Sequence, residues 1–279
     1  MKNIIKLFVT FTIIVGSSIA FASEKNIKLI LAAAEGGGTA TMSTPLVSAL
    51  EKRGYNVDLM IAGTCANARR LYESESGSTV VVWANSQLSE KFCDIGLPNE
   101  KNFLNIFFTL DNYFCAKDDP SKALQGNTAV AIDSALPSWV RETLTNYNSG
   151  LSLIPYENSA AIDRALVSNE VSAVFSDSGE FFQKNGRVTC KYVANSMPPK
   201  NYKSLGSEIG VENFDFRFVM YSFVKNMDEN TKKDLRADLQ NIFKTDDGVI
   251  EFMRNRQFSI DVQLDDSSTQ LNSVINSVR

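Results

Sequence analysis

The feature that most constrains the fold of this chain is the alternation of short apolar runs with amphipathic segments. Residues 27–33 form an apolar run that ends at a glycine turn, and an amphipathic segment follows it. Further apolar runs at 57–61 and 79–83 lie on either side of a second helical segment through Arg70. Strands that alternate with helices pair in parallel, because each helix carries the chain back to the edge where the previous strand began. The first part of the chain therefore predicts a βαβαβ unit.

The ends of the first helix are predicted from three residues. Thr44 and Pro45 supply a cap and a first-turn proline, and Gly54 supplies a stop signal. We therefore expect the helix to begin at Thr44 and Pro45 and to end before Gly54.

The same alternation restarts after an aromatic-rich stretch at residues 103–116. The second unit is predicted to contain strands at 128–132, 151–155, 171–175 and 187–193, with helices at 137–146 and 159–167. The clearest amphipathic helix of the chain covers 228–243, and a short helix follows it around 249–253. The predicted fold class is α/β, with two lobes that are each a mostly parallel sheet flanked by helices.

A glycine turn, residues 35–39, separates the first predicted strand from the first predicted helix. Its three consecutive glycines allow the backbone to approach a ligand closely. The helix behind them offers unpaired N–H groups and a positive dipole end. We therefore expect this turn to bind an anion.

Residues 1–22 have the pattern of a secretory signal peptide. Lys2 and Lys6 precede an apolar run at 7–19, and Ala-Phe-Ala ends the segment at 20–22. The apolar run is shorter than the ~20 residues that span a bilayer, and no later stretch qualifies. We expect cleavage before Ser23 and a soluble exported protein.

The charge and the absence of histidine exclude several function classes. Without Lys2 and Lys6 the 28 Lys and Arg become 26, against 32 Asp and Glu, so the exported chain has a net charge of −6. A nucleic-acid binder needs an excess of phosphate-binding cations, so we expect no nucleic-acid partner. The chain has no histidine, which removes Ser-His-Asp and Cys-His sites and the common zinc sites. We expect no cofactor, no metal site and no enzyme activity.

The four cysteines are even in number and belong to an exported chain, so we expect two disulfides. The positions are Cys65, Cys93, Cys115 and Cys190. Four cysteines allow three connectivities, and their spacing contains no Cys-x-x-Cys pair. The residues alone leave these connectivities open.

Small polar residues follow the strands of both predicted lobes. Open α/β sheets bind ligands at the carboxyl ends of their strands, so two such lobes indicate a receptor that closes on a ligand. The candidate ligand-binding residues of the first lobe are Gly36, Gly37, Gly38, Thr39, Ala40, Gly63, Thr64, Asn67 and Asn85. Those of the second lobe are Asp133, Ser134, Ala135, Tyr156, Ser176 and Asp177. Arg69 and Arg70 open the second helix, and a surface ion pair is the commoner role for such residues.

Several segments resemble, in order, the periplasmic solute-binding receptors of tripartite tricarboxylate transporters, also called the Bug receptors. The turn at 36–39 is similar to the first ligand loop of that family, and 63–67 is similar to its second glycine-rich loop. The other matching segments are 155–156, 161–166, 169–172, 186–188 and 204–210. The likeness runs from about Ile27 to about Gln257 and rests on the order of the segments. Ala40 stands where the family usually has an acidic residue, and Thr64, Cys65 and Ala66 replace glycines of the second loop.

The resemblance implies a type II periplasmic binding fold with lobes at 23–112 plus 217–279 and at 113–216. It implies a monomeric receptor that holds a small organic anion, such as a di- or tricarboxylate, through backbone N–H groups and ordered waters. Membrane subunits of a tripartite tricarboxylate-type transporter would take up the released ligand. The family topology also implies the disulfides Cys65–Cys93 and Cys115–Cys190, the second joining adjacent strands.

Two other function classes stay open at this point. An exported hydrolase or thiol enzyme on the same scaffold would use Cys65 or Asp133 as the reacting group. A sensory adaptor would bind the same ligand and report to a kinase. A thiol titration distinguishes the thiol enzyme from a receptor, whereas the sensory adaptor differs only in its partner.

Overall fold

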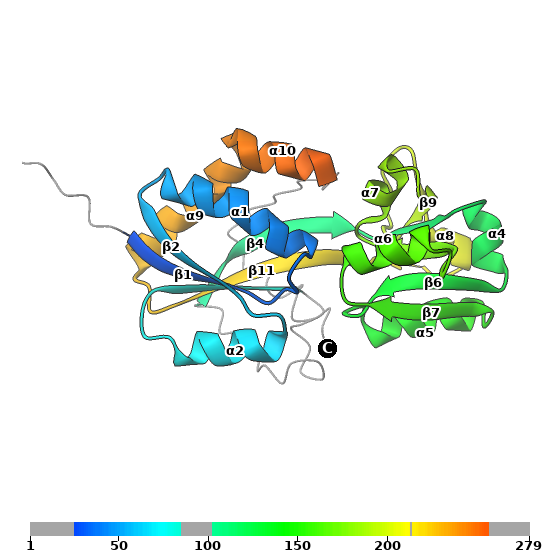
Figure 1. The fold of residues 1–279 in the computed structure, drawn as a ribbon, viewed down its shortest axis with the longest axis horizontal. Helices are drawn as coiled ribbons and strands as arrows, with labels where there is room; N and C mark the ends of the chain where they lie inside the picture. The colour runs from blue at the N-terminus through cyan, green and yellow to red at the C-terminus, as the bar shows by residue number, and fades with distance from the viewer. Residues whose placement is uncertain (1–24, 85–101, 213, 257–279) are drawn as a thin grey trace, which may run out of the picture.

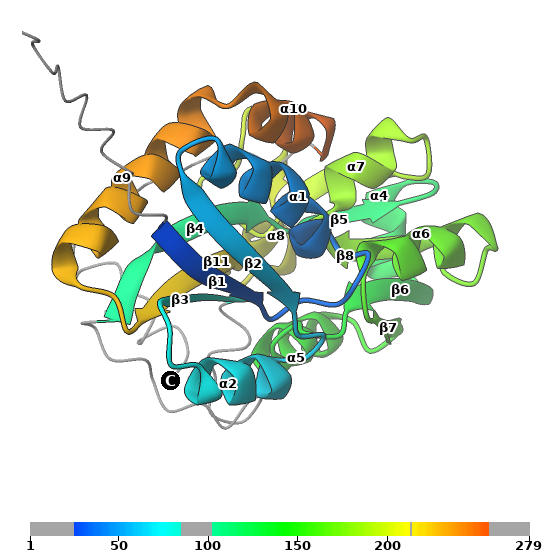
Figure 2. The ribbon, with the colours of Figure 1, turned by 60° about the vertical axis from the view of Figure 1, so that its left-hand side comes forward.

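Two β-sheets divide the described part of the chain into two lobes. The computed structural model describes residues 25–84, 102–212 and 214–256. Figure 1 shows the two lobes side by side, with helices on both faces of each sheet, and Figure 2 shows the first lobe from another side. The first sheet has the strand order β2-β1-β3-β11-β4, and the second has the order β10-β9-β5-β8-β6-β7. This is the predicted α/β fold class.

The first lobe begins as the predicted βαβαβ unit. Its elements are β1 (Lys25–Leu31), α1 (Gly38–Glu51), β2 (Tyr55–Ile61), α2 (Cys65–Ser74), β3 (Thr79–Ala84), β4 (Phe103–Asp111), β11 (Arg217–Lys225), α9 (Glu229–Thr245) and α10 (Asp247–Arg256). β1 pairs in parallel with β2 and β3, whereas β11 is antiparallel to β3 and β4. The first three strands of the chain, β1, β2 and β3, therefore form the parallel part of the sheet.

Helix α1 begins at Gly38, six residues before the Thr44 that the sequence suggested as its cap, so that prediction of the helix start is wrong. Gly37 is the N-cap, in an extended conformation, and Pro45 lies inside the helix. Pro45 has no N–H to donate to the carbonyl of Thr41, so the helix continues past it with one backbone hydrogen bond fewer. The buried face of the helix, which includes Met42 and Leu46, holds it on the sheet despite this loss.

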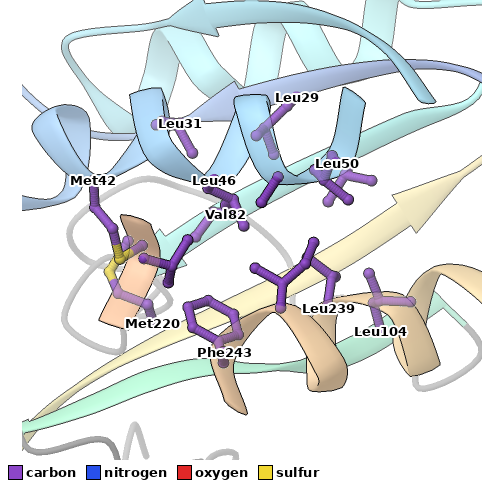
Figure 3. Close-up of a cluster of buried hydrophobic side chains, with 14 of the residues drawn as sticks. Leu29, Leu31, Met42, Leu46, Leu50, Val82, Leu104, Met220, Leu239 and Phe243 are labelled. Carbon is purple, nitrogen blue, oxygen red and sulfur yellow. The ribbon is translucent and has the colours of Figure 1, made fainter. Parts of the chain in front are cut away.

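The core of the first lobe lies between the sheet and the helices α1, α9 and α10. Figure 3 shows side chains from β1, α1, β3 and α9 meeting there, among them Leu29, Leu46, Val82 and Phe243. Each of these four side chains is almost fully buried. A second cluster around Trp83 and the α2 helix covers the opposite face of the sheet. The sheet is therefore buried on both faces, as parallel sheets usually are.

The second lobe contains the rest of the described elements. They are β5 (Tyr113–Ala116), α4 (Pro120–Gln125), β6 (Thr128–Asp133), α5 (Ser138–Tyr147), β7 (Leu151–Tyr156), α6 (Ser159–Val167), β8 (Ala173–Ser176), α7 (Gly179–Lys184), β9 (Thr189–Val193), β10 (Lys203–Ser204) and α8 (Leu205–Ile209). β6 pairs in parallel with β7 and β8, and β5 is antiparallel to β8 and β9. Helices α4, α7 and α8 span only five or six residues, too few for the 3.6-residue periodicity that predicted the longer helices.

Two chain segments connect the lobes, and they lie side by side. One runs from β4 into β5 through Asn112, and the other returns through Phe216 into β11. The buried Asn112 side chain donates a hydrogen bond to the Phe216 carbonyl, and the Asn112 carbonyl accepts one from the Ala194 amide. The lobes are thus joined by a pair of hydrogen-bonded crossings.

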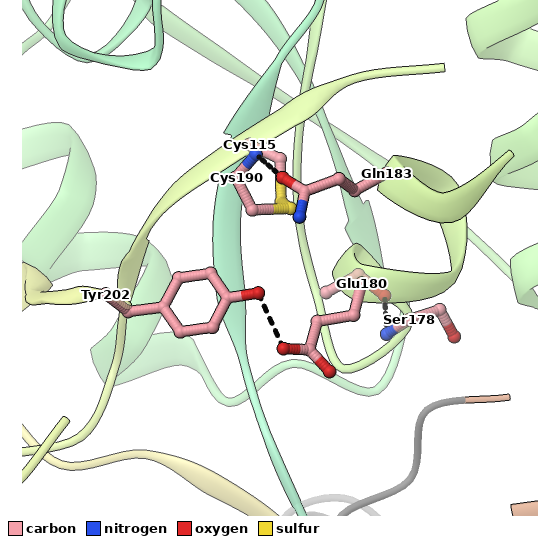
Figure 4. The surroundings of a disulfide bond; sticks show 7 residues. Cys115, Ser178, Glu180, Gln183, Cys190 and Tyr202 are labelled. Atoms are coloured by element: carbon pink, nitrogen blue, oxygen red, sulfur yellow. Dashed lines mark hydrogen bonds between the residues drawn. A yellow bond between two sulfur atoms is a disulfide. The ribbon is translucent and has the colours of Figure 1, made fainter. Parts of the chain in front are cut away.

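A disulfide joins Cys115 on β5 to Cys190 on β9, the pairing that the family resemblance implied. The two residues are directly opposite each other in the sheet, and both are buried. Figure 4 shows helix α7 beside the bridge, where the Gln183 side chain accepts a hydrogen bond from the Cys190 amide at 2.6 Å. The Tyr202 hydroxyl donates to the Glu180 carboxylate of the same helix. The bridge links β5 to β9, and the hydrogen bonds of Gln183 and Glu180 tie α7 to the neighbouring chain.

Gly179 opens helix α7 in a position with no room for a side chain. A Cβ atom there would lie 2.6 Å from the Cβ of Tyr113 and 2.9 Å from the Cys115 sulfur. Neither atom is the far end of a flexible side chain, so Gly179→Ala should lower the free energy of unfolding by about 1–3 kcal/mol. Chemical denaturation measures this change. Gly77→Ala is the matched control because nothing lies within 4 Å of its Cβ position, and equal stability of the two variants would contradict the prediction.

Candidate ligand-binding site

The carboxyl ends of strands from both sheets open onto one cavity of about 700 Å³. The first lobe contributes the loops after β1 and β2, the first turns of α1 and α2, and the last residue of β3, which provide Ala32, Ala33, Ala34, Glu35, Gly37, Gly38, Thr39, Gly63, Thr64, Cys65, Ala66 and Ala84. The second lobe contributes the loops after β6, β7 and β8, which provide Asp133, Ser134, Ala135, Glu157, Asn158, Ser159, Ser176, Asp177 and Ser178. A cavity of this volume has the size of a small-molecule site.

Four described helices begin at the cavity wall: α1, α2, α6, and α7, whose N-cap is Ser178. In the first lobe α1 begins at Gly38, and its N-cap, Gly37, makes no side-chain cap hydrogen bond. Helix α2 begins after Thr64, whose hydroxyl accepts from the Asn67 amide. In the second lobe α6 begins after Asn158, whose side chain accepts from the Ala161 amide. Helix N-termini carry partial positive charge, so the first lobe offers two of them to an anion.

Asp133 and Asp177 are two half-buried acidic residues of the second lobe's wall. The Asp133 Oδ1 atom accepts a hydrogen bond from the Ala135 amide at 2.7 Å. The Asp177 Oδ1 atom accepts from the hydroxyls of Ser176 and Ser178. Burial, and to a smaller extent the nearby charge of Asp177, raise the pKa of the Asp133 carboxyl to about 7. Burial also raises the pKa of Asp177, although the hydrogen bonds from the two serines act in the opposite direction.

The raised pKa of Asp133 makes the ligand-free protein less stable as the pH rises from about 4 to about 7. In that range the folded state retains a proton that the unfolded state has lost, so the stability falls with pH and the full loss remains above pH 7. Asp133→Asn keeps the Oδ1 acceptor and removes the ionisable group. We expect it to raise the free energy of unfolding at pH 8 by about 1–3 kcal/mol and to leave it unchanged at pH 4. Denaturant unfolding at both pH values measures the difference, and a gain of equal size at pH 4 would refute the explanation.

The charged residues of the cavity wall are all acidic. Glu35 and Glu157 are exposed, one on each lobe, and no Lys or Arg is among the described residues that line the cavity. The positive charge of Arg141 acts on Asp133 and lowers the pKa of that carboxyl. Its guanidinium donates to the backbone carbonyls of Leu136 and Ser134, and Arg141 itself is not among the residues that line the cavity. A ligand in the cavity therefore meets acidic side chains and backbone amides.

Three apolar side chains come from the strands that connect the lobes: Leu110 on β4, and Phe218 and Met220 on β11. Sequence analysis did not select them. Side chains alternate between the two faces of β11, so some of them face the cavity. The sequence does not indicate which face of the strand that is. They give the cavity an apolar surface between the two polar lobes.

Ten of the predicted ligand-binding residues line the cavity: Gly37, Gly38, Thr39, Gly63, Thr64, Asp133, Ser134, Ala135, Ser176 and Asp177. Four others are not among the lining residues. Gly36 has a positive φ of 75° in the exposed part of the turn, and Ala40 is buried on α1. The Asn67 side chain donates to the Ala62 carbonyl, and the Tyr156 hydroxyl donates to Glu170. Asn85 lies outside the described residues.

The arginines at the start of α2 stay on the surface of the helix. Arg69 pairs with Glu73 at 2.8 Å, and Arg70 donates to the Asn67 side chain. Neither is among the residues that line the cavity. Arg69 therefore makes the surface ion pair that was the more common expectation, whereas the Arg70 contact is a hydrogen bond to a neutral side chain.

Cys65 lines the cavity as part of a disulfide and not as a thiol. Its predicted partner, Cys93, lies outside the described residues. A disulfide sulfur cannot act as a thiolate nucleophile. The Cys65 thiol-enzyme alternative is therefore wrong for the protein in this state.

The two lobes and the cavity at the carboxyl ends of both sheets define the type II periplasmic-binding-protein fold. Solved structures with this fold include BugD, with a TM-score of 0.70 and 13% sequence identity over 91% of this chain and 94% of that one. MatC from Rhodopseudomonas palustris, with bound malate, has a TM-score of 0.68 and 14% identity over 91% and 97%. Rpa4515 from R. palustris, with adipate, has a TM-score of 0.70 and 13% identity over 92% and 95%.

These similarities are similarities of fold, because the sequence identities are low. No protein-family model matches the chain, and no curated protein matches its sequence. The comparisons therefore show the fold of the chain, and its function must be argued from the site itself.

Among the described residues, no helix has both the length and the apolar character that a membrane crossing requires.

Proposed function

We propose that this protein is an exported solute-binding receptor that captures a small carboxylate between its two lobes. The observation that carries the proposal is the cavity, because it joins the amino ends of α1 and α2 to the polar loops of the other lobe. Backbone amides at helix N-termini bind carboxylates without a basic side chain. The malate and adipate named in the structures of MatC and Rpa4515 are carboxylates of a size that this cavity accepts.

Gly38 and Thr39 would supply the first amides of α1, with Gly63 and Thr64 beside them on the second loop. Asp133, Ser134 and Ala135 would bind the other end of the ligand from the opposite lobe. The remaining ligand contacts would come from Ser176, Asp177 and their neighbours. Closure of the lobes would exchange the water around the ligand for these fixed polar groups, and differential affinity for the closed state would drive it.

The receptor role sets the partners, the compartment and the lobe boundaries that we propose. The protein would be a periplasmic monomer after signal-peptide cleavage, and membrane subunits of a tripartite tricarboxylate-type transporter would receive the ligand. The boundaries would be 23–112 plus 217–279 and 113–216. They fall at the two hydrogen-bonded crossings near Asn112 and Phe216, where a change of backbone angles would move one lobe against the other.

A thermal-shift screen of the exported chain tests the receptor role. The panel would contain mono-, di- and tricarboxylates, amino acids, phosphonates and sugars. A ligand at 100 times its Kd should raise the free energy of unfolding by about 2.7 kcal/mol. A shift confined to compounds with a carboxylate is the expected result, and a shift confined to sugars or phosphonates would contradict the proposal.

A second candidate function uses the same cavity for chemistry. Two carboxyls with raised pKa values are a common arrangement for general acid and base catalysis, and Asp133 and Asp177 form such a pair. We favour the receptor, because two helix N-termini at the cavity wall offer fixed amide donors to a carboxylate, and the fold is shared with MatC, whose structure holds bound malate. Recovery of the bound compound unchanged after long incubation distinguishes the receptor from an enzyme.

A further inference from the structure

Two acidic side chains, Asp133 and Asp177, lie on the cavity wall where an anionic ligand would meet them. We propose that the protein takes up a proton together with each dicarboxylate ligand, and that the Asp133–Asp177 pair holds this proton. The inference rests on the proposed receptor function and adds a second bound species, the proton, to it. The affinity for the ligand would therefore depend on pH.

Asp133 and Asp177 come from neighbouring strands of the second sheet. β6 ends at Asp133, and Asp177 directly follows β8. The two strands are parallel, with Ile132 opposite Phe175, so both aspartates lie at the same edge of the sheet. Both line the cavity, and the negative charge of Asp177 acts on Asp133. The pair therefore presents two carboxyls to one side of the ligand space.

No described salt bridge neutralises the pair. The hydrogen bonds that the two carboxyls accept come from their own loops. Asp133 accepts from the Ala135 amide, and Asp177 accepts from the hydroxyls of Ser176 and Ser178. None of the ion pairs between described residues includes either aspartate. Neutral donors favour the ionised form of a carboxyl, but they leave its negative charge in the cavity wall.

Three other charged groups act on the pair or lie near it on the cavity wall. Arg141 on α5 lowers the pKa of Asp133, but its guanidinium already donates to two backbone carbonyls. Glu157, from the loop after β7, and Glu35, from the opposite lobe, also line the cavity. An anionic ligand therefore adds negative charge to a cavity whose described charged lining residues are all acidic.

The amino end of α6 would draw the negative charge of the ligand to the same wall. Ser159, the first residue of α6, lines the cavity. Tyr156, which lies shortly before this helix, is directly opposite Asp133 in the sheet. Because a helix N-terminus carries partial positive charge, one carboxylate of a dicarboxylate held between the lobes would lie close to the aspartates.

A ligand carboxylate at this position would favour the protonated form of the pair. Burial and the charge of Asp177 already raise the pKa of Asp133 to about 7. A further negative charge disfavours the ionised form and raises this pKa again. Slightly above pH 7 the free protein would then hold the pair mostly ionised, and the complex would hold it protonated. The O–H of a protonated Asp133 could also donate a hydrogen bond to the ligand.

Isothermal titration calorimetry in two buffers counts the protons. The probes are malate and adipate, titrated at pH 7.5 in HEPES and in Tris, because the observed heat then includes the ionisation heat of the buffer. A group whose pKa moves from about 7 to about 8 or above takes up at least about 0.5 proton at this pH. The same shift should weaken the affinity at least about fivefold between pH 7 and pH 9.

A double variant and a control assign the proton to the pair. Asp133→Asn with Asp177→Asn keeps the Oδ1 acceptors and removes both titratable groups. It should bind the same dicarboxylate with uptake below about 0.1 proton and with less than about a twofold change in affinity between pH 7 and pH 9. Asp118→Asn, at an exposed position outside the cavity lining, should retain the proton uptake of the natural chain.

The natural chain alone decides the inference if the double variant does not fold. Binding of malate or adipate with no proton uptake, or with proton release, would overturn the inference and leave the receptor function standing. Uptake that persists in the double variant would also overturn it, because the proton would then belong to another group. Binding of neither probe would overturn the inference as well, and the wider thermal-shift screen would then decide the receptor function separately.

Discussion

Gly37→Leu should abolish measurable ligand binding and leave the protein folded. Gly37 stands at the N-cap of α1 with a φ of −70°, which leucine can adopt. A Cβ there would lie 3.1 Å from the Ala34 carbonyl oxygen, so the turn must shift by a few tenths of an ångström. Its Cβ position is 4.0 Å from the Cβ of Asn158 on the opposite lobe, so a longer side chain would enter the space between the lobes. We expect the affinity to fall at least about 100-fold, which is about 2.7 kcal/mol.

Calorimetric titration of the variant and the natural chain with the same carboxylate measures this loss. Gly77→Leu is the matched control, because Gly77 has open space around its Cβ position and is not among the residues that line the cavity. Circular dichroism and the unfolding midpoint check that Gly37→Leu is folded, with a change in stability of less than about 1 kcal/mol. An affinity equal to that of the Gly77→Leu control would remove the first loop from the site.

Removal of the Cys115–Cys190 bridge should give the largest loss of stability of any change considered. The bridge closes a segment with a sequence separation of 75, and a loop of that size stabilises by about 4 kcal/mol in the chain-entropy model. Both cysteines are buried between β5 and β9, so the double variant Cys115→Ala, Cys190→Ala also loses packing. We expect the free energy of unfolding to fall by about 2–5 kcal/mol.

Denaturant unfolding under non-reducing conditions measures the effect of the double variant. The bridge lies beside α7, and neither Cys115 nor Cys190 lines the cavity, so ligand affinity in native buffer should change less than about threefold. An unfolding midpoint equal to that of the natural chain would show that the sheet pairing alone holds β5 to β9. Such a result would contradict the stabilising role that we assign to the bridge.

The strands and long helices of this fold could be predicted because each carries its own pattern. The apolar run 79–83 became β3, and the amphipathic segment 228–243 became α9 with Asp228 as its N-cap. The start of α1 could not be predicted, since Thr44 and Pro45 are a strong local start signal. The burial of Met42 favours a helix that begins before Thr44. Tertiary packing therefore determines where α1 begins.

The candidate site was predictable as a set of loops and less so as a set of side chains. Strand ends locate the loops after β1, β2, β6 and β8, which is why ten predicted residues line the cavity. The directions of Asn67 and Tyr156 depend on the Ala62 carbonyl and on Glu170, partners that the sequence does not identify. Phe218 and its neighbours on the connecting strands line the cavity because of the way the two lobes are joined. The join depends on the whole fold, so no single segment of the sequence predicts it.

A crystal structure of the protein with the compound that gives the largest thermal shift tests the central claim most directly. We predict electron density for one molecule in the cavity, with a carboxylate within hydrogen-bond distance of the Gly38 or Thr39 amide and a second contact to the loop of Asp133. Density at any other place, with the cavity occupied only by water at saturating ligand concentration, would contradict the account of this protein as a receptor that binds between its lobes.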